Sequence, residues 1–261
     1  MRTSYFPSVL LAIAHIVLAY PSPILDEKDV FKRNVLTKLP RNTDANSAKY
    51  QPALDFDKDS CYNTAAVDPN GNVNPGLPNK GSNPSAGCRD RQRLDNANVY
   101  SRSRCNNGWC AYMYEYYFEV DRTGAGSGGH VHDWENVVVF VQNNNRIARV
   151  APSAHGDYSG ATNNPVLDGN HALIVYHKDG GSTHSFRIAR EDERNNVENE
   201  YGWWQIADLV AWNGYPNDYV QDQLTRHDFG KASIKLVDSR FGDNLKKAAG
   251  NSVPGFDPYQ W

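Results

Sequence analysis

The segment Gly129-His130-Val131-His132-Asp133-Trp134-Glu135 holds four side chains that can bind a cation or act as acids and bases. A glycine-rich run, Gly124–Gly129, precedes them, and the apolar residues Val137–Val141 follow. Flexible backbone therefore leads into a predicted strand at the place where the polar groups cluster. A fold can hold a binding or catalytic site at such a junction.

Strand geometry divides these side chains between two faces. Side chains alternate along a strand, so Asp133 and Glu135 share one face if the strand extends back to Asp133. His132 and Trp134 then point the other way, and we interpret both as structural. His130 lies in the glycine-rich segment, where the backbone can fold back towards Asp133. Asp121 ends the preceding aromatic strand, and a hairpin would bring it close to His130.

Two aspartates, a glutamate and a histidine form an oxygen-rich set of ligands. Hard divalent cations such as Mg²⁺ and Ca²⁺, with Mn²⁺ as a third candidate, prefer such ligands. Zinc is typical of other patterns, such as HExxH, which the sequence lacks. The alternative is that these residues are solvated charges of a hairpin. His155 and His184 each border a predicted strand, and each either lines the same pocket or satisfies a buried hydrogen bond.

The N-terminus has the pattern of an export signal, with Arg2 before the apolar stretch Val9–Ala19. We predict a signal peptide over residues 1–19 and a secreted protein, because this stretch is too short to span a membrane. Residues 20–53 are predicted to form a flexible arm or pro-region. Lys32-Arg33 within it is either a processing site or a pair of solvated charges. Residues 54–261 suit a single domain.

Charge excludes some partners. Without Arg2, 26 basic and 30 acidic residues give a net charge of −4 with neutral histidines. This balance argues against nucleic acid and against simple electrostatic binding to anionic lipid. Any membrane contact is expected to be peripheral and to depend on specific recognition.

The cysteines are even in number and lack both CxxC metal spacing and a catalytic signature. In an exported protein they predict two disulfides among Cys61, Cys88, Cys105 and Cys110. Three pairings are possible, and the sequential one closes the two loops most simply. Asn107-Gly108 is a turn signal that would bring Cys105 and Cys110 together.

Short strands separated by turn residues favour a mainly β protein, an antiparallel β-sandwich with a few peripheral helices. The predicted strands are Ala111–Phe118, Glu135–Val141, Arg146–Ala151, Ala172–His177 and Ser185–Ala189. The predicted helices are Asn217–Leu224, which follows Pro216, and Phe241–Ala249, which Gly250 ends.

These residues resemble the necrosis- and ethylene-inducing protein-like family, which fungi, oomycetes and bacteria secrete. The family's hallmark is GHRHDWE, and this chain differs from it only at Val131. Ala111–Asp121 resembles the family's AIMYxxYFxKD pattern. Further matches include Cys88-Arg89-Asp90, Cys105–Cys110, Thr183-His184-Ser185 and Trp212-Asn213-Gly214-Tyr215-Pro216. The similarity extends from about Leu54 to Ala249.

The resemblance implies a β-sandwich like that of actinoporins and certain fungal lectins, with a divalent cation in an acidic surface cavity. By motif position, Asp121 and Asp133 would hold the cation directly. His130 and Glu135 would hold it through bound waters, with His184 nearby. Cytolytic members of the family recognise the sugar headgroup of plant glycosyl inositol phosphoceramide sphingolipids. Membrane damage, cell death and immune signalling follow, and plant immune receptors are further candidate partners.

The chain departs from the family at two places. Val131 removes a positive charge beside the site, and Gly180-Gly181 offers no large aromatic side chain before His184. We therefore keep two alternatives to a non-enzymatic toxin. One is a non-cytotoxic, secreted, lectin-like recognition protein. The other, less favoured, is a metal-dependent hydrolase, for which the sequence lacks an obvious separate nucleophile or base.

Overall fold

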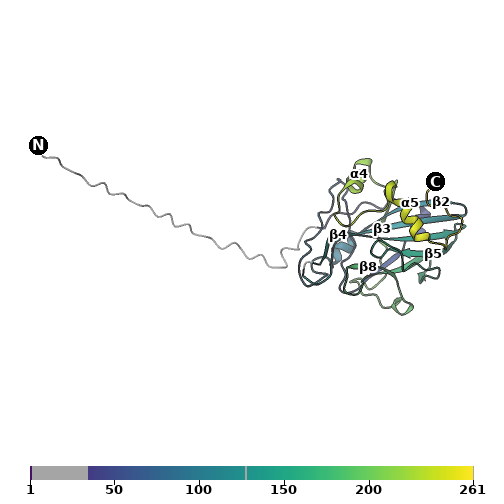
Figure 1. The fold of residues 1–261 in the computed structure, drawn as a ribbon, viewed down its shortest axis with the longest axis horizontal. Helices are drawn as coiled ribbons and strands as arrows, with labels where there is room; N and C mark the ends of the chain where they lie inside the picture. The colour runs from purple at the N-terminus through teal and green to yellow at the C-terminus, as the bar shows by residue number, and fades with distance from the viewer. Residues whose placement is uncertain (2–34, 127, 261) are drawn as a thin grey trace.

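Two β-sheets packed face to face form the centre of the protein, in a computed structural model that describes Met1, residues 35–126 and residues 128–260 (Figure 1). None of the helices in these residues has the length and apolar character of a bilayer span. The elements are, in chain order, α2 (Ala45–Lys49), β1 (Ala53–Phe56), α3 (Arg91–Asp95), β2 (Asn98–Asn106), β3 (Trp109–Arg122), β4 (Gly129–Gln142), β5 (Arg146–Pro152), β6 (Leu167–Asp168), β7 (His171–Lys178), β8 (His184–Ile188), the 3₁₀ helix η1 (Glu191–Glu193), β9 (Asp208–Ala211), α4 (Asp218–Arg226) and α5 (Asp238–Ala249).

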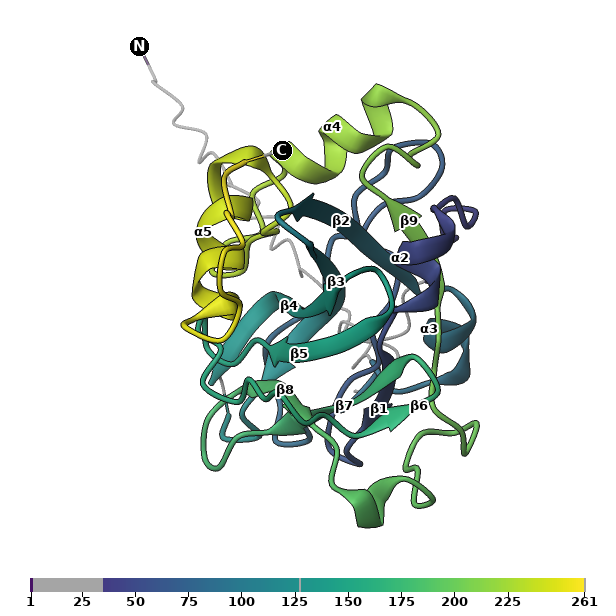
Figure 2. The same cartoon turned by 90° about the vertical axis from the view of Figure 1, so that its right-hand side faces the viewer.

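The larger sheet has the strand order β5-β4-β3-β2-β9. Its longest ladder is the β3–β4 hairpin, which runs from the Trp109–Gln142 pair to the Arg122–Gly129 pair. The smaller sheet has the order β1-β7-β6, with β8 also paired to β7. Figure 2 shows α5 beside the larger sheet and the smaller sheet below it.

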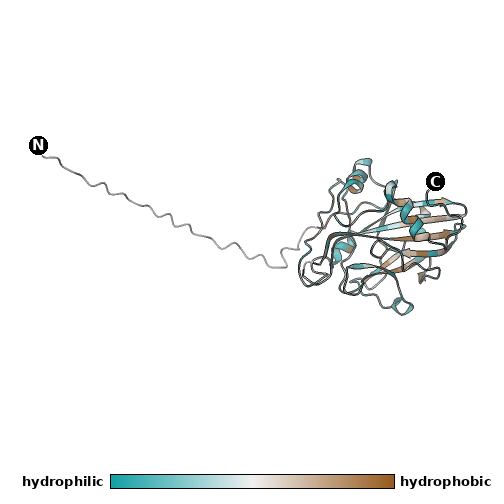
Figure 3. Ribbon diagram, in the orientation of Figure 1, coloured by the Kyte–Doolittle hydropathy of each residue, from teal (hydrophilic) through white to brown (hydrophobic). Residues whose placement is uncertain are grey.

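Both faces of the larger sheet are buried. On β4, Val137 and Val139 belong to the same hydrophobic cluster as Tyr176 of β7. Val138 and Phe140, on the other face, belong to a cluster that includes residues of α4 and α5. The strand therefore reads as a continuous apolar run, as expected where both faces of a sheet are covered. Figure 3 shows the hydrophobic residues concentrated in the strands.

The predicted β-sandwich, its five strands and its two late helices are confirmed. The sheets are not purely antiparallel, however, because β1 pairs with β7 and β2 pairs with β9 in parallel. More than 100 residues separate the strands of each of these pairs. A connection of that length lets the chain return in the same direction, which a tight hairpin does not allow.

The packed domain extends further towards the N-terminus than Leu54, where the sequence places its start. Leu39 and Tyr50 are fully buried. The amide of Asn42 donates to the carbonyl of Leu209, and its carbonyl accepts from the amide of Ala211, which adds this segment to the edge of β9. The predicted signal peptide and the Lys32-Arg33 pair lie outside the described residues.

The sequential disulfides are confirmed, since Cys61 is bonded to Cys88 and Cys105 to Cys110. Between the second pair, Asn107 has φ 50° and Gly108 has φ 79°. Two consecutive positive φ values are what a tight two-residue hairpin requires. The first disulfide anchors the irregular loop that precedes α3.

Glu115 is an ionisable side chain buried in β3, with 0% of its surface exposed. One carboxylate oxygen accepts a hydrogen bond from the amide of Lys235 at 2.7 Å, and the other has no partner among the described residues. Burial raises the pKa of Glu115 to about 8, although the nearby charges of Lys235 and Arg240 act to lower it.

We predict that Glu115→Gln flattens the pH dependence of stability. The folded protein keeps the proton of Glu115 up to about pH 8, whereas the ordinary pKa is 4.5. The free energy of unfolding therefore falls as pH rises between these values, by about 1.4 kcal/mol per pH unit for this group. Urea unfolding of both proteins from pH 5 to pH 8 tests this. Parallel curves for the two proteins would contradict it.

We also predict that the two disulfides contribute unequally. The Cys61–Cys88 bond closes a loop with a sequence separation of 27, and the Cys105–Cys110 bond one of 5. Loop-closure entropy then gives about 3.5 and about 2 kcal/mol respectively. Replacing Cys61 and Cys88 with alanine should lower the melting temperature more than replacing Cys105 and Cys110. An equal or reversed loss in calorimetry would refute the entropic explanation.

Candidate cation-binding site

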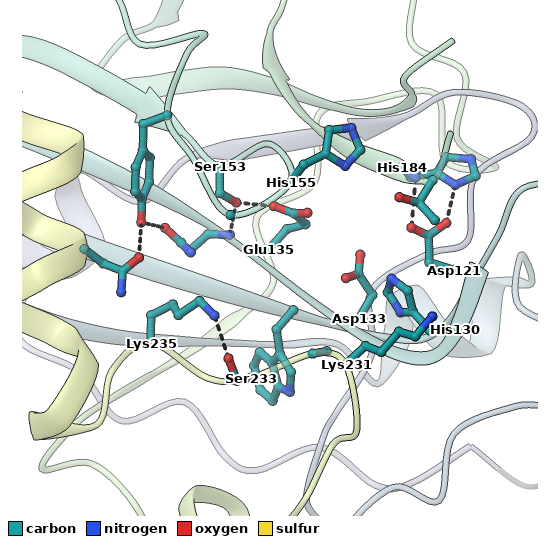
Figure 4. A pocket seen from close by; sticks show the side chains of 17 residues that line it. Asp121, His130, Asp133, Glu135, Ser153, His155, His184, Lys231, Ser233 and Lys235 are labelled. Atoms are coloured by element: carbon teal, nitrogen blue, oxygen red, sulfur yellow. Dashed lines mark hydrogen bonds and ion pairs between the residues drawn. The ribbon is translucent and has the colours of Figure 1, made fainter. Parts of the chain in front are cut away.

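Three side chains from the β3–β4 hairpin converge at its open end. Asp121, His130 and Asp133 each offer a ligand atom, and these atoms lie within 4.8 Å of one another. Asp121 is 1% exposed and Asp133 is 6% exposed. Figure 4 shows Asp133 and His130 lying beside Asp121. In the described residues, this is the only group of three or more histidines, cysteines or acidic residues with that geometry.

The hairpin achieves this convergence by breaking its own alternation. Asp133 is paired with Phe118, and His130 with Asp121. Regular pleating would place these two pairs on opposite faces, because they are three residues apart. His132 lies between them with φ 60°, a left-handed conformation that is uncommon for a residue other than glycine. This residue changes the direction of the strand, so that both pairs contribute to one site.

The imidazole of His130 is oriented by the same irregularity. Its Nδ1 lies 2.6 Å from the carbonyl oxygen of His132 and donates to it. The Nε2 atom therefore keeps its lone pair and is the ring nitrogen able to bind a cation. The sequence suggested that His130 lies in a flexible loop, whereas it belongs to β4.

Gly129 allows the two strands to close next to the site. Its φ is 102°, and a Cβ atom there would lie 2.0 Å from the carbonyl oxygen of Asp121. No other residue type fits this approach without moving the strands apart. The last glycine of the run therefore has a steric role immediately beside the Asp121–His130 pair.

Residues of the smaller sheet hydrogen-bond to both aspartates of the larger sheet. His184 of β8 binds Asp121 twice, through its Nδ1 atom at 2.6 Å and its amide at 2.9 Å. The hydroxyl of Tyr176 in β7 donates to Asp133 at 2.9 Å. The ring of Tyr176 stacks between Phe118, at 3.8 Å, and His184, at 5.2 Å. Residues from both sheets therefore fix the positions of the carboxylates.

Burial and mutual repulsion disfavour negative charge at this site. Burial raises the pKa of Asp133 to about 7, and the neighbouring Asp121 carboxylate adds to the increase. Burial and the charge of Asp133 also hold the pKa of Glu135 well above its ordinary value. The hydroxyl of Ser153 donates to Glu135 and accepts a hydrogen bond from the amide of Asn136. A divalent cation would offset the repulsion, so these residues fit the predicted cofactor.

The site opens into a cavity of about 230 Å³. The cavity lies at the edge of β4, because the pairing of β4 with β5 ends at Val137 and Pro152. Lys231 and Lys235 form the wall opposite the carboxylates (Figure 4). The ammonium group of Lys235 donates to the Ser233 hydroxyl at 2.6 Å. The cavity therefore has an acidic end and a basic side.

The remaining predicted residues have distinct positions. His184 contacts Asp121 directly, as described above. His155 also lines the cavity, but its Nε2 atom lies 3.0 Å from Asp179 and its side chain is 41% exposed. His132 points away, with its Nδ1 atom 2.6 Å from the hydroxyl of Tyr117. Trp134 packs against Tyr117, but it also lines the cavity, which the alternation of side chains along the strand did not predict.

Four residues that help to form the site were not predicted as site residues from the sequence. They are Tyr176, which holds Asp133, Ser153, which holds Glu135, and the two lysines of the opposite wall. Each lies more than 15 residues from the hallmark heptapeptide. Only the sheet topology brings them to it.

Comparisons with known proteins identify relatives of this chain. The sequence profile of the family described as Necrosis inducing protein (NPP1) matches residues 44–248. NLP effector protein 10 of Phytophthora capsici is 31% identical over 229 residues, which are 85% of this chain and 89% of that protein. Necrosis-inducing protein NPP1 of Phytophthora nicotianae is 31% identical over 199 residues, which are 74% of this chain and 77% of that protein.

Solved structures share the same fold. A structure of NLPPya in complex with mannosamine has a TM-score of 0.67 and 30% identity, covering 82% of this chain and 95% of that one. A second, in complex with glucosamine, has a TM-score of 0.66 at the same identity and coverage. Non-toxic HaNLP3 has a TM-score of 0.69 and 28% identity, covering 82% and 96%. The chain therefore belongs to the necrosis-inducing protein (NPP1) family.

Proposed function

We propose that this chain is a secreted effector that binds a sugar headgroup on the plant cell surface through a divalent cation. The observation that carries the proposal is the convergence of Asp121, His130 and Asp133 in a cavity open to solvent. Buried carboxylates this close together are costly unless a positive charge accompanies them.

The ligand set of the proposed site is the one that the resemblance to the family implies. Asp121 and Asp133 would hold the cation directly, and His130 and Glu135 would hold it through water. Mg²⁺ and Ca²⁺ suit these oxygen ligands, with Mn²⁺ as a third candidate. When bound, the cation would supply coordination positions for sugar hydroxyl groups. The amino-sugar complexes of NLPPya support a saccharide ligand.

The proposed target is the headgroup of glycosyl inositol phosphoceramide sphingolipids in the plant plasma membrane. Contact with the membrane would be peripheral and would lead to leakage, cell death and immune signalling, in which plant immune receptors would take part. The proposal involves no enzymatic step, and its relatives are named as effectors and necrosis-inducing proteins.

A non-cytotoxic recognition protein is the second candidate. HaNLP3 is non-toxic, and its TM-score of 0.69 to this chain is as high as those of the amino-sugar complexes. The fold alone therefore does not decide whether sugar binding leads to membrane damage.

We predict that Asp133→Asn lowers the affinity for Mg²⁺ and Ca²⁺ at least about ten-fold, because it removes a charged ligand from a buried site. Isothermal titration calorimetry at pH 7.5 measures the loss. The control is Asp222→Asn, which makes the same charge change on α4, where Asp222 pairs with Arg226. Equal affinities in the two variants would contradict the proposed ligand set.

We further predict that the protein releases dye from vesicles that contain plant glycosyl inositol phosphoceramides. Release should require the cation and should be lost in Asp133→Asn. Leakage that persists in EDTA would refute the cation mechanism. Cation-dependent binding to the vesicles without leakage would instead identify a non-cytotoxic recognition protein.

A further inference from the structure

A second polar pocket lies at the other end of the larger sheet. It has a volume of about 270 Å³ and is formed by the segment before α2, the middle of β2 and the residues that follow β9. Gly214 forms part of its wall, and a Cβ atom there would lie 2.1 Å from the carbonyl oxygen of Asn42. The N-terminal segment is thus held tightly against the wall, so the pocket is part of the packed domain.

Two hydroxyl groups in this pocket lack hydrogen-bond partners among the residues that the structure describes. Ser101, on β2, is 1% exposed, and its Oγ atom is buried without a partner. The Oγ1 atom of Thr43 is likewise buried and unpartnered. Both residues line the pocket. A buried hydroxyl without a partner costs free energy, so such groups usually bond to water or to a ligand.

The charged groups of the pocket favour a neutral ligand. The guanidinium of Arg102 donates to the carbonyl of Leu236 at 2.6 Å and to the carboxylate of Asp238 at 2.5 Å. Its charge is therefore already compensated, and Asp44 adds a carboxylate to the lining. An anionic ligand would have to compete with Asp238 and would be repelled by Asp44.

The rest of the lining suits a polyhydroxylated molecule. Hydroxyl groups, side-chain amides and a carboxylate can all hydrogen-bond to sugar hydroxyls. Trp212 supplies an aromatic surface, and its ring lies 4.5 Å from the guanidinium carbon of Arg102. The volume lies just below the usual range for drug-sized ligands, so it suits a single ring.

We propose that this pocket is a second ligand site, which binds a neutral monosaccharide or cyclic polyol without a metal ion. Ser101 pairs with Tyr114, seven residues before Asp121 on β3. The two sites are therefore separated by roughly 23 Å along the strand.

The test is a titration of the ¹⁵N-labelled secreted protein with glucose, mannose, galactose and myo-inositol, monitored by NMR. We expect saturable shifts of the amides of Thr43, Ser101 and Gly214 at millimolar ligand. These shifts should persist in EDTA, which removes the cation, and in Asp133→Asn, which weakens the cation site. Shifts around Ser101 therefore test the second site, whereas shifts around Asp133 test the proposed function. Either result can be obtained without the other.

Two variants probe the unpartnered hydroxyls. Thr43→Val and Ser101→Ala should each weaken binding about five-fold, as expected for the loss of one or two hydrogen bonds. Thr225→Val is the matched control, because the Thr225 hydroxyl bonds within α4 to the carbonyl of Gln221. Melting temperatures establish that each variant is folded.

Three results would overturn the proposal. The first is an absence of shifts around Ser101 with every sugar, which would mean that only water fills the pocket. The second is a non-saturable response, which would mean binding at very high concentration only. The third is equal affinity in Thr43→Val, Ser101→Ala and the control.

Discussion

Repulsion between buried carboxylates is the constraint on which the rest of the site depends. Asp121, Asp133 and Glu135 are all at least 94% buried. Besides burial, the charge of Asp121 raises the pKa of Asp133, and the charges of Asp133 and Asp121 raise the pKa of Glu135. Carboxylates placed so close together in a dry environment would ordinarily become protonated or move apart. Here the protein prevents separation, because each carboxylate has a hydrogen-bond donor from a different element.

These donors explain why the site requires the complete sandwich. Asp121 and Asp133 belong to the larger sheet, but their partners His184 and Tyr176 belong to the smaller one. The Tyr176 ring stacks on Phe118, the residue paired with Asp133, so packing between the sheets also sets the position of a ligand oxygen. Any change that shifts one sheet against the other would therefore change the distance between the two aspartates.

Much of this organisation can be predicted from the sequence, but only the parts that local sequence patterns determine. Alternation and turn residues were sufficient for the hairpin, the strands and the disulfide at Asn107-Gly108. Alternation also placed His132 outside the site, but it could not reveal that His132 itself bends the strand. The positive φ of His132 is supported by tertiary contacts, here with Tyr117 and Phe229, which no local turn signal reveals.

Long-range packing could not be predicted either, because it also depends on tertiary contacts. Leu39 lies in a largely polar stretch, and its contact with the core shows that packing begins before Leu54. Tyr176 and His184 come from strands distant in sequence and Ser153 follows β5, so no spacing rule identifies these donors. Residue types and the alternation of side chains along the strand therefore predicted which groups form the site. The sheet topology determines which donors hydrogen-bond to them.

The structure also limits what the substitution in the hallmark heptapeptide can affect. Val131 is half-buried, and its Cγ1 atom lies 2.6 Å from where a Cβ of Gly76 would be, so it packs on the loop before α3. Val131 does not line the cavity, whereas the ligand residues on either side of it do. The change from arginine therefore alters the loop side of the hairpin and leaves the carboxylates in place. Any effect of this residue on toxicity would act through the surface around the cavity, because the candidate ligands are unchanged.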